Sequence, residues 1–279
     1  MTAGDRSGIT PELREAYSRS GFSHLLAVSG LHTGIVFALV NLLLGWLPLL
    51  RRGHLLRNVA VVAAVWCFVA AAGFPPSAVR AAVMCTLLQT ALASASEYVA
   101  LNALAAAAFG MLLWNPAWIG DISFSLSFLA VAGILAWGVP LCRRLRGRSR
   151  IVRWVGEAYL IGLAATLATA PLVAHTFSLV PLVGVLVNPV AILLATVVVF
   201  GGALWLLLPA AWLAPVVALP VGAAAEGINA LARWVAAMPQ GTVETTLGEG
   251  WTAALYAAYA LLTLLAWSYE PKKRLFLSR

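Results

Sequence analysis

The chain has 279 residues, of which 62% are hydrophobic and 10% are charged, and its formal net charge is +8. Soluble domains contain about 45–50% apolar and about 25% charged residues. So few charges cannot cover the surface of a soluble protein of this length. The composition therefore excludes a soluble globular protein and a disordered chain. It predicts an all-α, polytopic transmembrane bundle whose surface lies mostly in lipid.

The first 21 residues are polar and are expected to form a segment that faces the outside. They do not place a basic stretch directly before an apolar core, so they do not read as a signal peptide. Thr10 before Pro11, in TPELREAY, predicts a short surface helix, because proline is favoured at the first helical position. Targeting is expected to come from the first membrane segment.

A membrane-spanning helix needs about 20 mostly apolar residues. That window predicts about nine segments within a transmembrane domain at 22–268. The first contains Ser29-Gly30 and is either continuous, broken, or preceded by a short in-plane helix. Asn188-Pro189 is expected to interrupt the seventh segment. Either the seventh or the eighth segment could be re-entrant or lie in the membrane interface instead of spanning the bilayer. The segments are 22–50, 55–73, 77–95, 98–115, 122–142, 154–177, 182–208, 211–238 and 251–268.

Most of the 18 basic residues fall in three clusters, at 51–57, 143–153 and 272–279. Cytoplasmic loops carry an excess of Lys and Arg, which predicts that all three clusters face the cytoplasm. An even number of predicted segments separates successive clusters, as this orientation requires. The N-terminus is then outside, and 269–279 forms a basic cytoplasmic tail. The cluster at 143–153 is interpreted first as an orientation signal that contacts lipid headgroups, with a DNA contact as the alternative.

Polar residues inside apolar segments are costly, so they usually face a cavity or a partner. In the first segment, His24, Ser29 and His32 are spaced so that they can share one side of a helix. In GFPPSAVRAA, the prolines predict a helix start that Ser77 can cap. Arg80 then either extends to the outer headgroups or faces inward toward a phosphate or an acid.

The later segments contain fewer polar side chains. Asp121 either caps the fifth segment or belongs to a polar lining. Glu226 and Arg233 share a helical stripe with Asn229, and they either form an ion pair or mark an interfacial helix. The remaining candidates are Asn102, Ser127, His175 and Asn188.

No catalytic or metal-binding pattern stands out. Ser29 and His32 only loosely resemble a nucleophile and its base, since no orienting third group follows. The cysteines Cys67, Cys85 and Cys142 stand alone, and HExxH and P-loop motifs are absent from the sequence. We therefore expect no enzymatic activity, no metal and no cofactor.

The segment HLLAVSGLH, followed in order by GFPPSAVRAA, LNALA, DISFSLSFLAV, and AP with HTF and VNP, resembles the competence domain of ComEC-type DNA-uptake proteins. The resemblance covers nearly the whole chain. It implies a channel in the bacterial inner membrane that passes single-stranded DNA during natural transformation. The positions that match the family motifs are His24, Ser29, Gly30, His32, Pro76, Ser77, Arg80, Asn102, Asp121, Ser127, Phe128, Pro171, His175 and Asn188.

The resemblance also implies partners: single-stranded DNA, membrane lipid, and other competence proteins that act as DNA receptor, helicase-type motor and nuclease. A homodimer is left open. Ser125 departs from the family, which usually has glutamine there. Full-length members commonly add an OB-like and a metallo-β-lactamase-like domain, so we expect this sequence to represent the core module without nuclease activity. The alternative function is a small-molecule or lipid transporter with the same architecture.

Overall fold

The computed structural model describes residues 10–26, 30–47, 53–93, 100–207, 213–238 and 241–268. Within them the chain is built from helices, as the composition predicts, with one exception. That exception is a short antiparallel pair formed by β1 (Leu179–Pro181) and β2 (Thr242–Glu244). It joins the turn after α9 to the connection before α12, two places that the sequence treats as loops.

Every predicted segment contains helix. Five helical stretches of the described residues are long and apolar enough to cross a membrane: Gly53–Ala71, Ile122–Arg143, Arg150–Phe177, Leu182–Trp205 and Pro215–Ala236. His32–Leu43 and Ala100–Trp114 are shorter apolar helices. The helices are α1 (Pro11–Arg19), α2 (Ser23–Leu26), α3 (Gly30–Leu43), α4 (Gly53–Ala71), α5 (Pro76–Ala93), α6 (Ala100–Trp114), α7 (Ile122–Gly133), α8 (Val139–Arg143), α9 (Arg150–Phe177), α10 (Leu182–Leu207), α11 (Leu213–Ala236) and α12 (Glu249–Ser268).

Two predicted segments differ in detail from continuous helix. The first contains two helices, α2 and α3, and Gly30 is the first residue of α3. The fifth contains a π-helical turn, Ile134–Gly138 (η3), between α7 and α8. π-helical turns of this kind occur mostly as single insertions inside α-helices.

The predicted interruption at Asn188-Pro189 is wrong. The helix α10 continues through Pro189 from Leu182 to Leu207. Proline removes one backbone hydrogen bond and disfavours a helix interior, but an apolar helix packed against neighbours tolerates that loss. Tertiary packing here outweighs the local preference of the proline.

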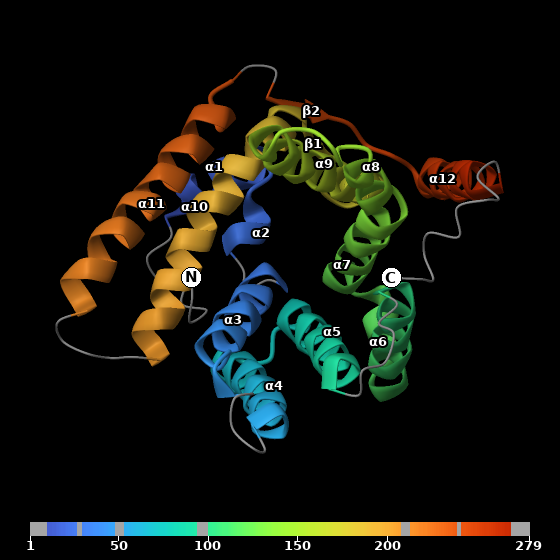
Figure 1. Ribbon diagram of the computed structural model, residues 1–279. Helices are drawn as coiled ribbons and strands as arrows, with labels where there is room; N and C mark the ends of the chain where they lie inside the picture. Colours follow the sequence, from blue (N-terminus) through green and yellow to red (C-terminus); the bar gives the residue numbers. More distant parts are fainter. Residues whose placement is uncertain are drawn as a thin grey trace.

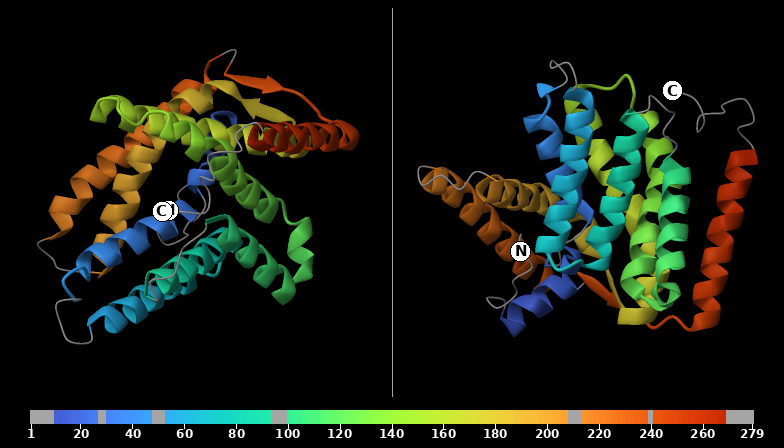
Figure 2. Two further views of the ribbon diagram at one scale, coloured as in Figure 1. Left: turned by 45° about the vertical axis from the view of Figure 1, so that its right-hand side comes forward. Right: turned by 90° about the horizontal axis from the view of Figure 1, so that it is seen from below.

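The helices form two groups. In Figure 1, α4, α5, α6 and α7 follow one another side by side, and contacts join each to the next. The hairpin of α10 and α11 lies on the other side, with α1 against α11, and is steeply inclined to the first group in Figure 2 (right). The helix α9 contacts both α7 and α10, so it connects the groups, while α12 lies at the edge.

The predicted N-terminal helix is confirmed as α1. The Oγ1 of Thr10 accepts a hydrogen bond from the backbone N–H of Leu13, which caps the helix at Pro11. One face of this helix is buried, because the Tyr17 ring packs in the core formed with α10 and α11. Its hydroxyl donates to Asn229 Oδ1 at 2.8 Å.

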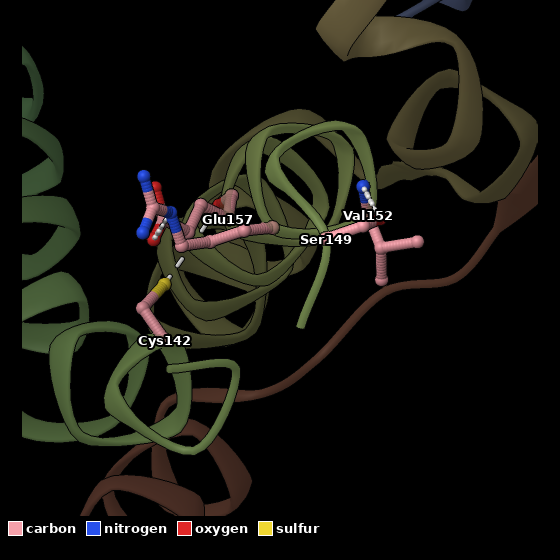
Figure 3. A network of polar contacts seen from close by, with 5 residues as sticks. Cys142, Ser149, Val152 and Glu157 are labelled. Atoms are coloured by element: carbon pink, nitrogen blue, oxygen red, sulfur yellow. Dashed lines mark hydrogen bonds and ion pairs between the residues drawn. The ribbon is translucent and has the colours of Figure 1, made fainter. Parts of the chain in front are cut away.

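The turn between α8 and α9 holds the largest cluster of arginines. Figure 3 shows Ser149 capping α9 through a hydrogen bond from the Val152 backbone N–H. The thiol of Cys142 approaches the backbone oxygen of Glu157, and the Glu157 carboxylate lies 3.8 Å from Arg153. The arginines otherwise point outward: Arg144, Arg146, Arg148 and Arg150 are exposed. This turn is therefore a basic surface.

Candidate functional site

The start of α5 positions a buried arginine side chain. Gly73 and Phe74 have positive φ angles of 81° and 53°, which turn the chain sharply after α4. The helix begins at Pro76, and the backbone N–H of Val79 donates to the Pro75 oxygen. Proline thus occupies the first helical position as expected. The prediction that Ser77 caps the helix is wrong, because Ser77 lies within it.

Arg80 follows one turn later and faces the interior. Its exposed fraction is 2%, so the alternative in which it reaches outward to headgroups does not describe this structure. Its Nη2 donates to the backbone oxygen of Ser123 at 2.8 Å. The carbon Cζ lies 5.7 Å from the ring centroid of Phe124 and 5.9 Å from that of Phe128. The helix α5 thus buries a guanidinium against α7.

The guanidinium is incompletely hydrogen-bonded. Both Nε and Nη1 of Arg80 are buried and have no acceptor among the described protein atoms. Arginine carries five N–H donors and no acceptor, so it depends on neighbouring oxygens. The carboxylate of Asp121 contributes favourable electrostatics but forms no ion pair with it within 4.0 Å. A buried cation with unmet donors is costly, which marks a functional-site candidate.

The start of α7 supplies the other half of the contact. Asp121 caps this helix, since its Oδ1 accepts from the Ser123 backbone N–H at 2.8 Å. Of the two interpretations of Asp121, the cap is therefore the one that the structure contains. Phe124 and Phe128 are one turn apart, and their ring centroids lie 4.5 Å from each other. Ser127, on the same helix, is half-buried.

The start of α3 packs against the start of α5. A methyl group on Gly30 would lie 3.5 Å from the Ala81 Cβ, so the two helices approach closely at this glycine. His32 is 1% exposed and lies near His24. His24 itself is exposed on α2, and its Nδ1 is 3.1 Å from the Gly21 oxygen. Gly30 and His32 thus lie at the start of α3, which packs against the start of α5, where Ser77 and Arg80 lie.

The other candidates are not part of this group. Asn102 is exposed on α6. The Nδ1 of His175 is 2.7 Å from the Leu247 oxygen, so this histidine holds the connection before α12. Asn188 lies on α10, and its Oδ1 is buried with no hydrogen-bond partner among the residues that the structure describes. Ser29 lies outside the described residues.

A second polar cluster was missed in the sequence. Arg57 Nη2 donates to Asn41 Oδ1 at 2.9 Å, the Asn41 amide donates to Gln89 Oε1 at 3.4 Å, and the Gln89 amide donates to Asn58 Oδ1. Gln89 is 2% exposed. This network joins α3, α4 and α5. The signal was available, because an amide side chain in an apolar segment predicts a partner on another helix.

The two polar clusters lie on opposite sides of α5. Arg80 and Gln89 are nine residues apart, which places them about half a helical turn from each other around the axis. Arg80 faces α7, whereas Gln89 faces α3 and α4. They therefore do not form one continuous wall along this helix.

Metal binding receives no support from the residues that the structure describes. Among them, no group of three His, Cys, Asp or Glu side chains could hold a metal ion. The ion pair considered for Glu226 and Arg233 is also not formed, and both side chains are exposed on α11.

Comparison with known proteins shows the family to which this chain is similar. Residues 1–270 match the family described as "Competence protein". The chain is 26% identical over 203 residues to "ComE operon protein 3" of Bacillus subtilis (strain 168), an alignment that covers 73% of this chain and 25% of the relative. It is 31% identical over 187 residues to an "Uncharacterized protein" of Aquifex aeolicus (strain VF5), covering 66% of this chain and 41% of the relative.

No solved structure matches the chain. The chain spans less than half the length of both relatives, so their full activities are not transferred with the match. The family match extends over nearly the whole sequence and includes every residue of the Arg80 contact. Together with the apolar helices, it identifies the chain as a membrane protein of the competence protein family.

Proposed function

We propose that this protein forms the path by which single-stranded DNA crosses the bacterial inner membrane during natural transformation. The observation that carries the proposal is the buried Arg80 guanidinium, two of whose nitrogen atoms lack acceptors within the described part of the chain, in a member of the competence protein family. Polar and charged groups inside a membrane bundle usually mark the route of a polar substrate. A phosphodiester oxygen is an acceptor that suits a guanidinium.

The proposal includes an arrangement in the membrane. The nine helical segments span or enter the bilayer, the N-terminus faces outward, and the basic turn at 143–153 faces the cytoplasm. The strong basic character of that turn supports this orientation. The hairpin of α10 and α11 is the pair for which an interfacial position fits best, because it is inclined to the other helices (Figure 2). Motor, receptor and nuclease activities belong to separate partners.

Complementation tests the function directly. A transformable host that lacks its own channel gene would express this chain and receive labelled DNA, and the label that resists externally added nuclease would be measured. We expect protected single strands in the cells that carry the chain. The empty vector is the negative control. Normal membrane insertion with no protected strand would contradict the proposal, and uptake of a small solute in its place would favour a transporter.

Cysteine labelling tests the orientation separately. Arg146→Cys, in a background with Cys67, Cys85 and Cys142 replaced by alanine, places one thiol on the exposed basic turn. An impermeant maleimide should label it only after the cells are opened. A cysteine at Ser18, on the exposed side of α1, is the matched control and should react in intact cells. The reverse pattern would contradict the proposed orientation without deciding the substrate.

A further inference from the structure

Arg80, Phe124 and Phe128 form a guanidinium–aromatic cluster between α5 and α7. We propose that this cluster is a nucleotide-binding station, at which Arg80 binds a phosphodiester and Phe128 stacks a base of the same strand. The inference rests on the proposed function and adds to it the chemistry by which the path holds its substrate. The cluster combines the two elements that proteins use to bind single strands of any sequence, positive charge for the backbone and aromatic rings for the bases.

The first element is the set of unmet donors. The Nη2 of Arg80 donates to the Ser123 oxygen, and no described residue supplies an acceptor for its Nε or Nη1. The N–H of Nε and the N–H groups of Nη1 point to opposite sides of the planar guanidinium, so they donate to two separate oxygens. A phosphodiester oxygen at either nitrogen would satisfy that donor and neutralise the charge. Lysine supplies a point charge on a flexible stem and cannot present donors in a fixed plane.

The second element is the pair of rings. Phe124 is buried, whereas Phe128 is half-buried and so is the ring nearer the surface of the contact. The rings are in contact, with centroids 4.5 Å apart and planes inclined at 38°. Phe124 therefore supports Phe128, and Phe128 offers the face on which a base can stack. Stacking on phenylalanine does not distinguish the bases, as a path for arbitrary sequences requires.

The contact as it stands is closed, because the guanidinium lies over both rings. Between Arg80 and α7 it consists of one hydrogen bond and these ring contacts. A rotamer change of Phe128 would uncover the guanidinium without unfolding α7, since side-chain rotamers exchange rapidly compared with helices. The strand would then replace the ring contact of Arg80 by a phosphate contact.

Binding of two oligonucleotides to the purified full chain in lipid nanodiscs tests this station. One is a short fluorescent oligothymidylate, and the other is an abasic strand of the same length, which keeps the phosphates and lacks the bases. Fluorescence anisotropy gives the affinity for each. For wild-type protein we expect tighter binding of the oligothymidylate. A wild-type chain that binds neither strand, or both equally, would overturn the inference.

The variants separate the two elements. Phe128→Leu should weaken the binding of the oligothymidylate by about tenfold, which is the contribution of one base stacked on an aromatic ring. It should leave the binding of the abasic strand unchanged. Arg80→Gln should weaken both strands. Phe109→Leu, a change of the same type on the exposed face of α6, should alter neither. Inorganic phosphate should compete weakly and to the same extent against wild type and Phe128→Leu, because it does not use the ring.

A purely structural role makes a different prediction. If Phe128 only holds α5 against α7, Phe128→Leu should weaken both strands equally, and this result would overturn the station. Phe128→Tyr keeps an aromatic ring and should restore the preference for bases, which guards against a folding defect of the leucine variant. If the complemented host takes up DNA but Phe128→Leu leaves both strand affinities unchanged, the proposed function is supported and the nucleotide-binding station is contradicted. Absence of both uptake and binding would remove both.

Discussion

Two of the contacts that the helix α7 makes with neighbouring helices are of opposite character. Toward α9 it presents Gly133, where an added methyl group would lie 2.4 Å from the Ala168 Cβ and 2.8 Å from the Ala164 oxygen. Toward α5 it presents two phenylalanines and a backbone oxygen to a buried guanidinium. The first contact joins small apolar residues with the backbones close together. The second joins large side chains around unmet hydrogen-bond donors.

The difference separates a structural contact from a functional one. Small residues allow helices to pack closely in a membrane, and such a contact has no space for rearrangement. A buried charge with unmet donors contributes little or negatively to stability and is retained where a substrate needs it. We therefore expect the α7–α9 contact to determine the stability of the protein and the α5–α7 contact to determine its activity.

The largest effect on stability is expected from Gly133→Ala. The added methyl group meets Ala168 and a backbone oxygen, so α7 and α9 must move apart, at a cost of about 2–3 kcal/mol. The midpoint of thermal unfolding in detergent should fall. Gly162→Ala is the matched control on α9, because nothing lies within 4 Å of its added methyl group, and its midpoint should hold or rise. Equal midpoints for the two variants would contradict close packing at Gly133.

A smaller loss is expected from Gln89→Leu, which breaks the network of α3, α4 and α5. The substitution leaves the Asn58 oxygen and the Asn41 amide without their shared partner, at a cost of about 1 kcal/mol. The thermal midpoint should fall less than in Gly133→Ala. Asn102→Leu replaces an exposed amide on α6 and is the control that should leave the midpoint unchanged. A loss of DNA uptake without any change in midpoint would instead assign this network to the path.

Tyr17→Phe tests the contact of α1 with α11 through its pH dependence. Burial raises the pKa of the Tyr17 phenol to about 12. The neutral phenol donates to Asn229, so the variant should lose about 1 kcal/mol at neutral pH. Because the folded-state pKa is raised, the contribution of Tyr17 is complete below pH 10 and is lost as the pH rises through about 12. The difference between the two proteins should shrink over that interval; a constant difference would contradict the buried phenol.

The smallest change in stability is expected from Arg80→Met, which also distinguishes most clearly between the α7–α9 and α5–α7 contacts. An apolar side chain of similar length removes the unmet donors, so the thermal midpoint should stay constant or rise by the equivalent of about 1 kcal/mol. DNA uptake by a complemented host should nevertheless fall by at least tenfold, the equivalent of about 1.4 kcal/mol. Loss of stability comparable with Gly133→Ala would show that Arg80 is structural. Normal uptake would remove it from the path.

Much of the fold could be predicted from the chain. The lengths of apolar segments located the helices α4 to α12 within a few residues, because a helix is the way to hydrogen-bond the backbone of a long apolar segment in lipid. The first predicted segment, 22–50, extends well beyond both ends of α3. Thr10 with Pro11 located the start of α1, and Pro76 that of α5. Pro189 misled the prediction, since packing around α10 was not visible in the sequence.

The site was predictable only in part. That Arg80 is unusual follows from its position in an apolar segment, and the family motifs indicate several of its neighbours. That its guanidinium faces Phe124 and Phe128, and that Asn41 meets Gln89 on the opposite side, depends on how three helices are rotated against one another. Hydropathy is nearly uniform around these helices, so the sequence carries almost no signal for that rotation.

Composition and segment length thus determined that the protein is an all-α membrane protein, because the cost of exposing charge or backbone to lipid depends on local sequence alone. The tertiary structure decided which polar groups find partners and which remain unmet. A hydrogen bond between helices requires two side chains distant in the sequence to meet within about 3 Å. Only the packing of the whole bundle determines whether they do.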